Sequence, residues 1–273
     1  MKNILAIVLL VFSAGIYGQD FNEKLVIPLS SPGSAGKLEV GLIRGDIKIE
    51  VYDGSDVVVE ATASPKGGSD CASCDDDNKK SQAPAGMKRI ASSSVELSAS
   101  ESNNRVEIET NSWKKGLDLN IKIPKDFDLE VSTVHGKISV EGVKGAMEVS
   151  AVNGSLTFTD VSGSIICNTV HGDVTANFKG VTSGEPMSFV TLHGNVDVTF
   201  PASVKASTKM KSDRGEIYTD FDMTVNKNRP EVKSRERGEY KVSINAWVFG
   251  DINGGGPEYT FKNMSGDIII RKD

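Results

Sequence analysis

An eighteen-residue repeat constrains this chain more than any other feature of its sequence. The segment at 133–140 reads TVHGKISV, and it recurs as AVNGSLTF at 151–158, TVHGDVTA at 169–176 and TLHGNVDV at 191–198. Gly145 and Gly163 mark a half-way turn, and the longer step before the last copy predicts extra loop residues at 181–186. Weaker copies surround Gly45, Gly215 and Gly266. A period of this length predicts a stack of similar coils.

Apolar and polar residues alternate within each copy, which is typical of half-buried strands and not of helices. The alternation predicts an inward ladder of Leu129, Met147, Ile165 and Met187, with Cys167 also facing inward. A change of phase before each glycine predicts a corner there and a second inward ladder of Val134, Val152, Val170 and Leu192. Glycine suits such a corner because it lacks a Cβ atom. We therefore predict an all-β solenoid with two short strands in each coil of about eighteen residues.

The rest of the chain divides around this repeat. We predict a signal peptide at 1–18, an N-terminal β-rich part at 19–125 with an exposed loop at 64–90, regular coils at 126–220, and C-terminal strands with a cap at 221–273. The less regular flanking strands are expected to cap the solenoid, because its last coils expose unpaired backbone.

The N-terminus has the three parts of a secretory signal. Lys2 is followed by an apolar run from Ile4 to Phe12 and then by small residues up to Gly18. This layout predicts export and cleavage after Gly18. The apolar run is too short for a membrane-spanning helix, and no second run follows it. We expect a periplasmic or cell-surface protein without a transmembrane segment.

The net charge argues against nucleic acid as a partner. The formal charge is −6, and it becomes −7 once the segment carrying Lys2 is removed. An acidic chain repels phosphate backbones, and no basic stripe with interleaved aromatic residues occurs. No sequence motif indicates a cofactor either.

Several of these segments resemble a known bacterial family. The TVHGKISV and AVNGSLTF units, IKIPK at 121–125, INGGG at 252–256 and SGDI at 265–268 are similar to a family of proposed adhesins of unknown function. The resemblance implies a right-handed β-helix-like fold in an exported envelope protein. It implies no catalytic residues, and a fold by itself does not determine function.

The residue before each corner glycine is the main candidate ligand site. Stacking of the coils should place five such residues in one column: His135, Asn153, His171, His193 and Arg214. His171 and His193 should lie one coil apart, where two imidazoles could share a zinc or copper ion. The alternative is a polar turn position that is inherited by repetition.

Cys71 and Cys74 form a CASC motif in a polar, acidic segment. A zinc site would need a second pair of ligands, and a redox motif belongs at the start of a helix. The neighbouring acidic run lacks the spacing of a calcium loop. A local disulfide is the preferred interpretation in an oxidising compartment.

Two functions from different classes remain open at this stage. The preferred one is a non-enzymatic envelope protein, an adhesin or interaction scaffold, that binds a protein or surface glycan through the solenoid. The alternative is a metal-binding or glycan-processing protein that uses the histidine column and the polar residues near it, Asp173, Asn195, Asp197 and Glu216. No paired acids or nucleophile–base pair is evident in the repeat.

Overall fold

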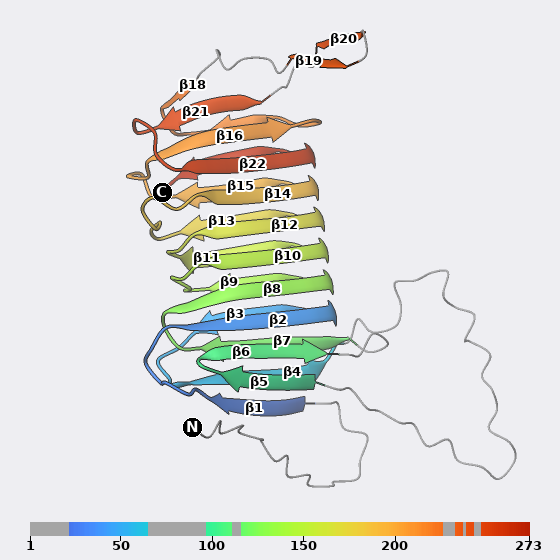
Figure 1. Cartoon of the computed structure of the whole chain (residues 1–273), viewed down its shortest axis with the longest axis vertical. Helices are drawn as coiled ribbons and strands as arrows, with labels where there is room; N and C mark the ends of the chain where they lie inside the picture. Colours follow the sequence, from blue (N-terminus) through green and yellow to red (C-terminus); the bar gives the residue numbers. More distant parts are fainter. Residues whose placement is uncertain (1–21, 65–96, 111–115, 226–232, 237–238, 243–246) are drawn as a thin grey trace, which may run out of the picture.

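The chain folds into a long stack of β-coils, shown in Figure 1. This computed structural model describes residues 22–64, 97–110, 116–225, 233–236, 239–242 and 247–273. The described residues contain strands and turns and no helix, and none of them forms a helical segment suited to crossing a membrane. The predicted all-β solenoid is therefore confirmed. The signal peptide, nearly all of the 64–90 loop, and Cys71 and Cys74 lie outside the described residues.

Two long sheets face each other across the core. Sheet A has ten strands, in the order β1 (Asn22–Pro28), β4 (Asp56–Ala63), β7 (Leu117–Ile123), β3 (Ile47–Val51), β9 (Ile138–Glu141), β11 (Leu156–Val161), β13 (Val174–Phe178), β15 (Val196–Phe200), β23 (Ile268–Lys272) and β17 (Ile217–Thr219). Each inner coil supplies one strand to this sheet and one strand to the sheet opposite.

Sheet B has eleven strands. Their order is β18 (Met223–Val225), β21 (Val248–Ile252), β16 (Ala206–Ser212), β22 (Glu258–Ser265), β14 (Met187–His193), β12 (Ile165–His171), β10 (Met147–Asn153), β8 (Phe127–His135), β2 (Gly36–Arg44), β6 (Arg105–Thr110) and β5 (Leu97–Ser102). A separate hairpin pairs β19 (Lys233–Glu236) with β20 (Glu239–Val242).

Parallel pairing joins the inner coils, and antiparallel pairing closes the ends. β8, β10, β12 and β14 pair in parallel at offsets that match the repeat, for example Val149 opposite Cys167 and Cys167 opposite Phe189. Antiparallel pairs occur at β1–β4 and β5–β6 at one end, and at β18–β21 at the other. The additional residues between β13 and β14 form the loop that the longer repeat step predicted.

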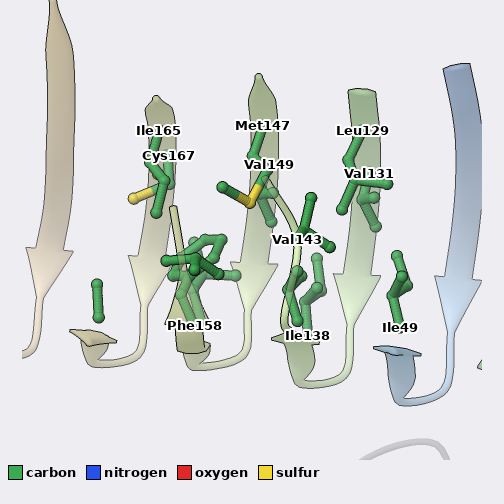
Figure 2. Close-up of a cluster of buried hydrophobic side chains, with 14 of the residues drawn as sticks. Ile49, Leu129, Val131, Ile138, Val143, Met147, Val149, Phe158, Ile165 and Cys167 are labelled. Atoms are coloured by element: carbon green, nitrogen blue, oxygen red, sulfur yellow. The ribbon is translucent and has the colours of Figure 1, made fainter. Parts of the chain in front are cut away.

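The core lies between the sheets as columns of apolar side chains, seen in Figure 2. The predicted ladder of Leu129, Met147, Ile165 and Met187 is confirmed, since each is at most 2% exposed. Cys167 is buried as expected. Towards the C-terminal coils the core becomes aromatic, and the rings of Phe189 and Phe261 stack 5.2 Å apart.

The second predicted inward ladder is wrong. Val134, Val152 and Leu192 are 38–42% exposed, and Val170 is only half-buried. The inward positions belong instead to the preceding residues, Thr133, Ala151, Thr169 and Thr191. The alternation continues unbroken up to the corner, and threonine is tolerated inside because Thr169 Oγ1 and Thr191 Oγ1 donate to backbone carbonyls.

The order of coils in space differs from their order along the chain. We expected the strands after residue 220 to cap the solenoid. Of these, β18 and β21 do lie at the end of sheet B, whereas β22 lies between β14 and β16, and β23 lies between β15 and β17. Figure 1 accordingly marks the C-terminus partway along the stack. At the other end, β2 and β3 lie between the β6–β7 pair and the β8–β9 pair. The coils present similar inward ladders to their neighbours. A coil from the C-terminal end of the chain can therefore be inserted in the interior of the stack.

Candidate functional site

Stacked glycine corners build the candidate site. The backbone N–H of Gly154 donates to the carbonyl of His171 at 2.9 Å, and Gly172 donates to His193 at 3.0 Å. Gly136 donates in the same way to Asn153 at 3.1 Å. A Cβ atom on Gly154 would clash with the carbonyl oxygen of Gly136, and a Cβ on Gly172 would clash with that of Gly154. Glycine is therefore required here by close approach, and the ladder sets the position of the residue before it.

The column predicted from the repeat forms at this corner. Pairing between strands places His135 beside Asn153, Asn153 beside His171, and His171 beside His193. All of these side chains are exposed. The imidazole rings of His171 and His193 stack with centroids 5.0 Å apart and planes 19° from parallel. Nδ2 of Asn153 lies 3.2 Å from Nδ1 of His135.

Two members of the column escaped the sequence analysis. Ser265 lies between His193 and Arg214, because β22 is inserted before β16. Its backbone carbonyl accepts from Gly194, and the Arg214 carbonyl accepts from Gly266. Arg44 precedes His135 at the other end. Both residues precede a corner glycine of a weaker repeat copy, and that position was the signal that could have identified them. We call the full set Arg44, His135, Asn153, His171, His193, Ser265 and Arg214 the corner column.

The polar residues just after the corner glycines accept hydrogen bonds from the backbone of the neighbouring coil. Oδ1 of Asp173 accepts from the N–H of Asn195 at 2.8 Å, and Oδ1 of Asn195 accepts from the N–H of Asp267 at 2.8 Å. Asp267 repeats this contact with the N–H of Glu216 at 2.9 Å. These side chains therefore tie each coil to the next. They account for two of the four polar residues that the glycan-processing alternative invoked.

Asp197 is engaged in a different way. Its carboxylate accepts two hydrogen bonds from the guanidinium of Arg271, at 2.8 and 2.9 Å, across β15 and β23. A bidentate pair of this kind fixes the orientation of the carboxylate. Glu216 is the remaining acid of that alternative, and it is exposed.

The column offers a metal ion only part of a coordination shell. Within the ranges that the structure describes, no group of three or more His, Cys, Asp and Glu residues is placed to hold an ion. His171 and His193 could supply two nitrogen ligands, whereas zinc normally takes three or four from protein.

Sheet A presents aligned polar rows next to the corner. The strand register places Ser139, Thr157, Thr175 and Asp197 side by side, with Asn177 and Thr199 in a second row. These side chains face away from the core, opposite in direction to their buried neighbours. Neighbouring coils lie about 4.8 Å apart, so the rows repeat hydroxyl and amide groups at that spacing.

Two shallow hollows lie at the opposite edge of the coils. Their volumes are about 330 and 360 Å³, and both are lined by Val51, Gly142 and Lys144. Ion pairs cross them, such as Lys179 with Asp160 at 2.7 Å and Lys125 with Asp53 at 2.6 Å. Neither hollow includes a residue of the corner column.

The chain is similar to one protein family and to two solved structures. Residues 9–253 match a family model described as Toastrack DUF4097. A search of curated proteins finds no match. A similar solved structure is a putative cell adhesion protein from Clostridium sporogenes ATCC 15579, with 14% identity, 93% of this chain and 100% of that chain covered, and a TM-score of 0.46. Another is a putative adhesin from Bacteroides fragilis NCTC 9343, with 12% identity, 95% and 100% coverage, and a TM-score of 0.40.

Proposed function

This chain belongs to the Toastrack DUF4097 family, and from that premise we propose that it is an exported, non-enzymatic envelope protein that binds an extended protein or glycan. The observation that carries the proposal is the corner column together with the polar rows of sheet A beside it. Both are continuous over several coils. A solenoid presents such a surface to elongated ligands, because each coil repeats the same contact.

The chemistry of this surface suits hydrogen bonding along a chain. Thr157, Thr175 and Asn177 can each donate and accept, and the imidazoles of His171 and His193 can do the same. A glycan or an extended peptide also carries alternating donors and acceptors. A ligand lying along the stack would contact equivalent groups on successive coils.

The engagement of the nearby acids supports a binding role over a hydrolytic one. Glycoside hydrolysis normally needs two carboxyl groups that flank the scissile bond. Asp173 accepts a hydrogen bond from the backbone N–H of Asn195, and Asp197 accepts one from the guanidinium of Arg271. Glu216 alone cannot provide both the acid and the nucleophile or base.

Binding can be tested with the purified protein on arrays of envelope polysaccharides and on crosslinked envelope extracts. We expect any specific ligand to bind about tenfold more weakly to a His171→Ala/His193→Ala double variant, because two hydrogen bonds are lost. Lys144→Ala, at the opposite edge, is the matched control and should leave affinity unchanged. If the affinity for the ligand were unchanged in the double variant but reduced in Lys144→Ala, the binding site would lie at the opposite edge of the coils.

Location is tested separately, by protease treatment of intact and outer-membrane-permeabilised cells. Digestion on intact cells would indicate surface display and favour the adhesin role. Protection until permeabilisation would indicate the periplasm and favour an envelope scaffold. Recovery of the protein in the cytosolic fraction would contradict the export that Lys2–Gly18 predicts.

The stacked imidazoles favour one second candidate, a surface metal site at His171 and His193. Such a site would raise the melting temperature on addition of Zn²⁺, because an ion that binds only the folded state stabilises it. The rise should vanish in the His171→Ala/His193→Ala variant. An equal response in both proteins would remove this candidate.

A further inference from the structure

An exposed aliphatic ladder runs along the outer face of sheet B. The strand registers place side by side the six residues Ile43, Val134, Val152, Val170, Leu192 and Met264. Four of them are 38–42% exposed, and the other two are half-buried. Ile166, in the central strand β12, is 51% exposed on the same face. Scattered apolar side chains are normal on a surface, whereas a continuous column of them marks a contact surface.

Charge on this face is divided along the stack. Acidic side chains gather on β2, β6, β8 and β10, and they are Glu39, Glu107, Glu109, Glu130 and Glu148. Basic side chains gather on β16 and β22, and they are Lys209, Lys211 and Lys262. Internal partners offset part of each group. Lys37 pairs with Glu39 and Glu130, and Arg105 on β6 pairs with Glu39. Lys211 lies 3.1 Å from Asp213, and Lys209 lies 3.9 Å from Glu258 of β22. The strand midway between the two groups, β12, carries no Asp, Glu, Lys or Arg.

The charge distribution on this face is self-complementary when a second copy is rotated by 180° to face the first. A two-fold axis parallel to β12 would place β8 of one copy over β22 of the other, and β2 over β16. The acidic half of each face then meets the basic half of its partner, and ladder meets ladder. We propose that the outer face of sheet B binds a second copy of this chain in such a two-fold dimer. Isologous contacts of this kind are the commonest in homo-oligomers.

The size of the face fits a stable dimer. The seven strands from β2 to β16 cover about 34 Å at the ordinary strand spacing, and about seven residues per strand cover roughly 23 Å. The product is close to 800 Å² per copy, which is the area that a standard interface buries on each partner. Face-to-face packing of two sheets is also a common way to bury such a surface.

The dimer leaves the polar rows of sheet A, one part of the proposed ligand surface, free. Sheet A lies across the core from sheet B, so the polar rows of the two copies would face outward on opposite sides. The corner columns would lie at the rim of the interface. Two ligand surfaces on one particle increase the overall strength of attachment to a repetitive target. The dimer itself does not depend on the proposed function, because it needs no ligand.

Sedimentation of the purified protein over a range of concentrations tests the proposal. We expect a dimer, and we expect Ile166→Glu to raise its dissociation constant at least tenfold, because the axis brings the two introduced carboxylates together. Tyr218→Glu is the matched control, since Tyr218 is 53% exposed but lies on β17 of sheet A. That variant should dimerise normally. Equal melting temperatures verify that both variants are folded.

A charge exchange tests the direction of packing without touching the apolar ladder. Lys262→Glu should weaken the dimer. Addition of Glu130→Lys to that variant should restore it in part, because Glu130 lies on the facing strand two residues from the position opposite Lys262. A protein that stays monomeric up to about 100 μM, well above the range of specific complexes, would overturn the proposal. So would a dimer that Ile166→Glu leaves intact, or one for which the charge exchange gives no recovery. None of these outcomes depends on ligand binding, so they separate this proposal from the function proposed above.

Discussion

The hydroxyl of Thr169 donates a 2.9 Å hydrogen bond to the carbonyl oxygen of Gly154, the corner glycine of the neighbouring coil. Thr191 makes the same 2.9 Å bond to Gly172. These bonds join the inward threonine ladder to the corner ladder, and they explain how a polar residue occupies a core position. The same carbonyl of Gly154 is the atom with which a Cβ on Gly172 would clash. The corner thus depends on a hydroxyl from inside and on the absence of side chains at the turn.

Replacement of Thr169 by valine should therefore destabilise the protein. The variant keeps the shape of the side chain but leaves a carbonyl with one partner fewer, which costs about 1–2 kcal/mol. Urea unfolding would measure the loss. Thr175→Val is the control, because Thr175 is exposed on sheet A, and its cost should stay below about 0.5 kcal/mol. Equal costs for the two variants would mean that the buried hydrogen bond adds nothing.

Gly154→Ala should be among the most damaging single substitutions. Its Cβ atom would overlap the Gly136 carbonyl oxygen, which belongs to backbone and cannot move aside. We expect a loss of about 3 kcal/mol or more. Gly41→Ala is the matched control two coils away, where the added Cβ would lie 3.9 Å from Ser132 Oγ. A shift in the urea midpoint for Gly41→Ala as large as that for Gly154→Ala would contradict the close-approach argument.

Phe261 should stabilise coils on both sides of its own. Its ring is fully buried and stacks on Phe189 of β14, while its strand also pairs with β16. Phe261→Ala should cost about 3–5 kcal/mol. Hydrogen exchange should then accelerate in β14 as well as in β16, because β22 lies between them. Acceleration confined to β16, β18 and β21 would indicate that the C-terminal coil supports only the end of the stack.

Cys167 should be chemically silent in the folded protein. Burial raises the pKa of its thiol, so almost no thiolate is available to react. In a Cys71→Ser/Cys74→Ser variant we expect no alkylation by iodoacetamide until the protein is unfolded, followed by a single addition detected by mass spectrometry.

The wild-type protein tests the predicted Cys71–Cys74 disulfide in the same assay. Unfolding without reductant should allow one alkylation, and unfolding after reduction should allow three, matching the three cysteines of the chain. Three alkylations without reductant would show that Cys71 and Cys74 are free thiols.

The charge cluster at Glu39 predicts a small acid-dependent loss of stability. Its hydrogen bond with Lys37 lowers the pKa of the Glu39 carboxyl. A lowered pKa contributes stability that is present at neutral pH and is lost as the pH falls through the folded-state value. Lys37→Met should therefore lower the free energy of unfolding by about 0.5–1 kcal/mol at pH 7. This difference from the wild type should become smaller when the pH falls below the ordinary pKa of glutamate. Denaturant unfolding at several pH values would check the trend, and a difference that grows in acid would contradict it.

Much of the fold can be predicted from the repeat itself. Regular spacing of Gly136, Gly154 and Gly172 indicates equivalent coils, and alternation around Met147 and Ile165 indicates which positions face inward. The corner column follows from the same registration, because residues at one position of a repeat must align when coils stack. These are local properties of each unit, so a single sequence contains them.

Other features depend on contacts between distant segments. Hydropathy favoured Val170 and Leu192 for the core, yet Thr169 and Thr191 are inside, because the corner carbonyls accept hydrogen bonds from their hydroxyls, which composition does not reveal. The position of β22 between β14 and β16 could not be predicted from the sequence either. Every coil offers its neighbours nearly the same parallel edge and the same inward ladder. The repeat therefore determined the shape of a coil, and only packing across the whole stack decided which coils are neighbours.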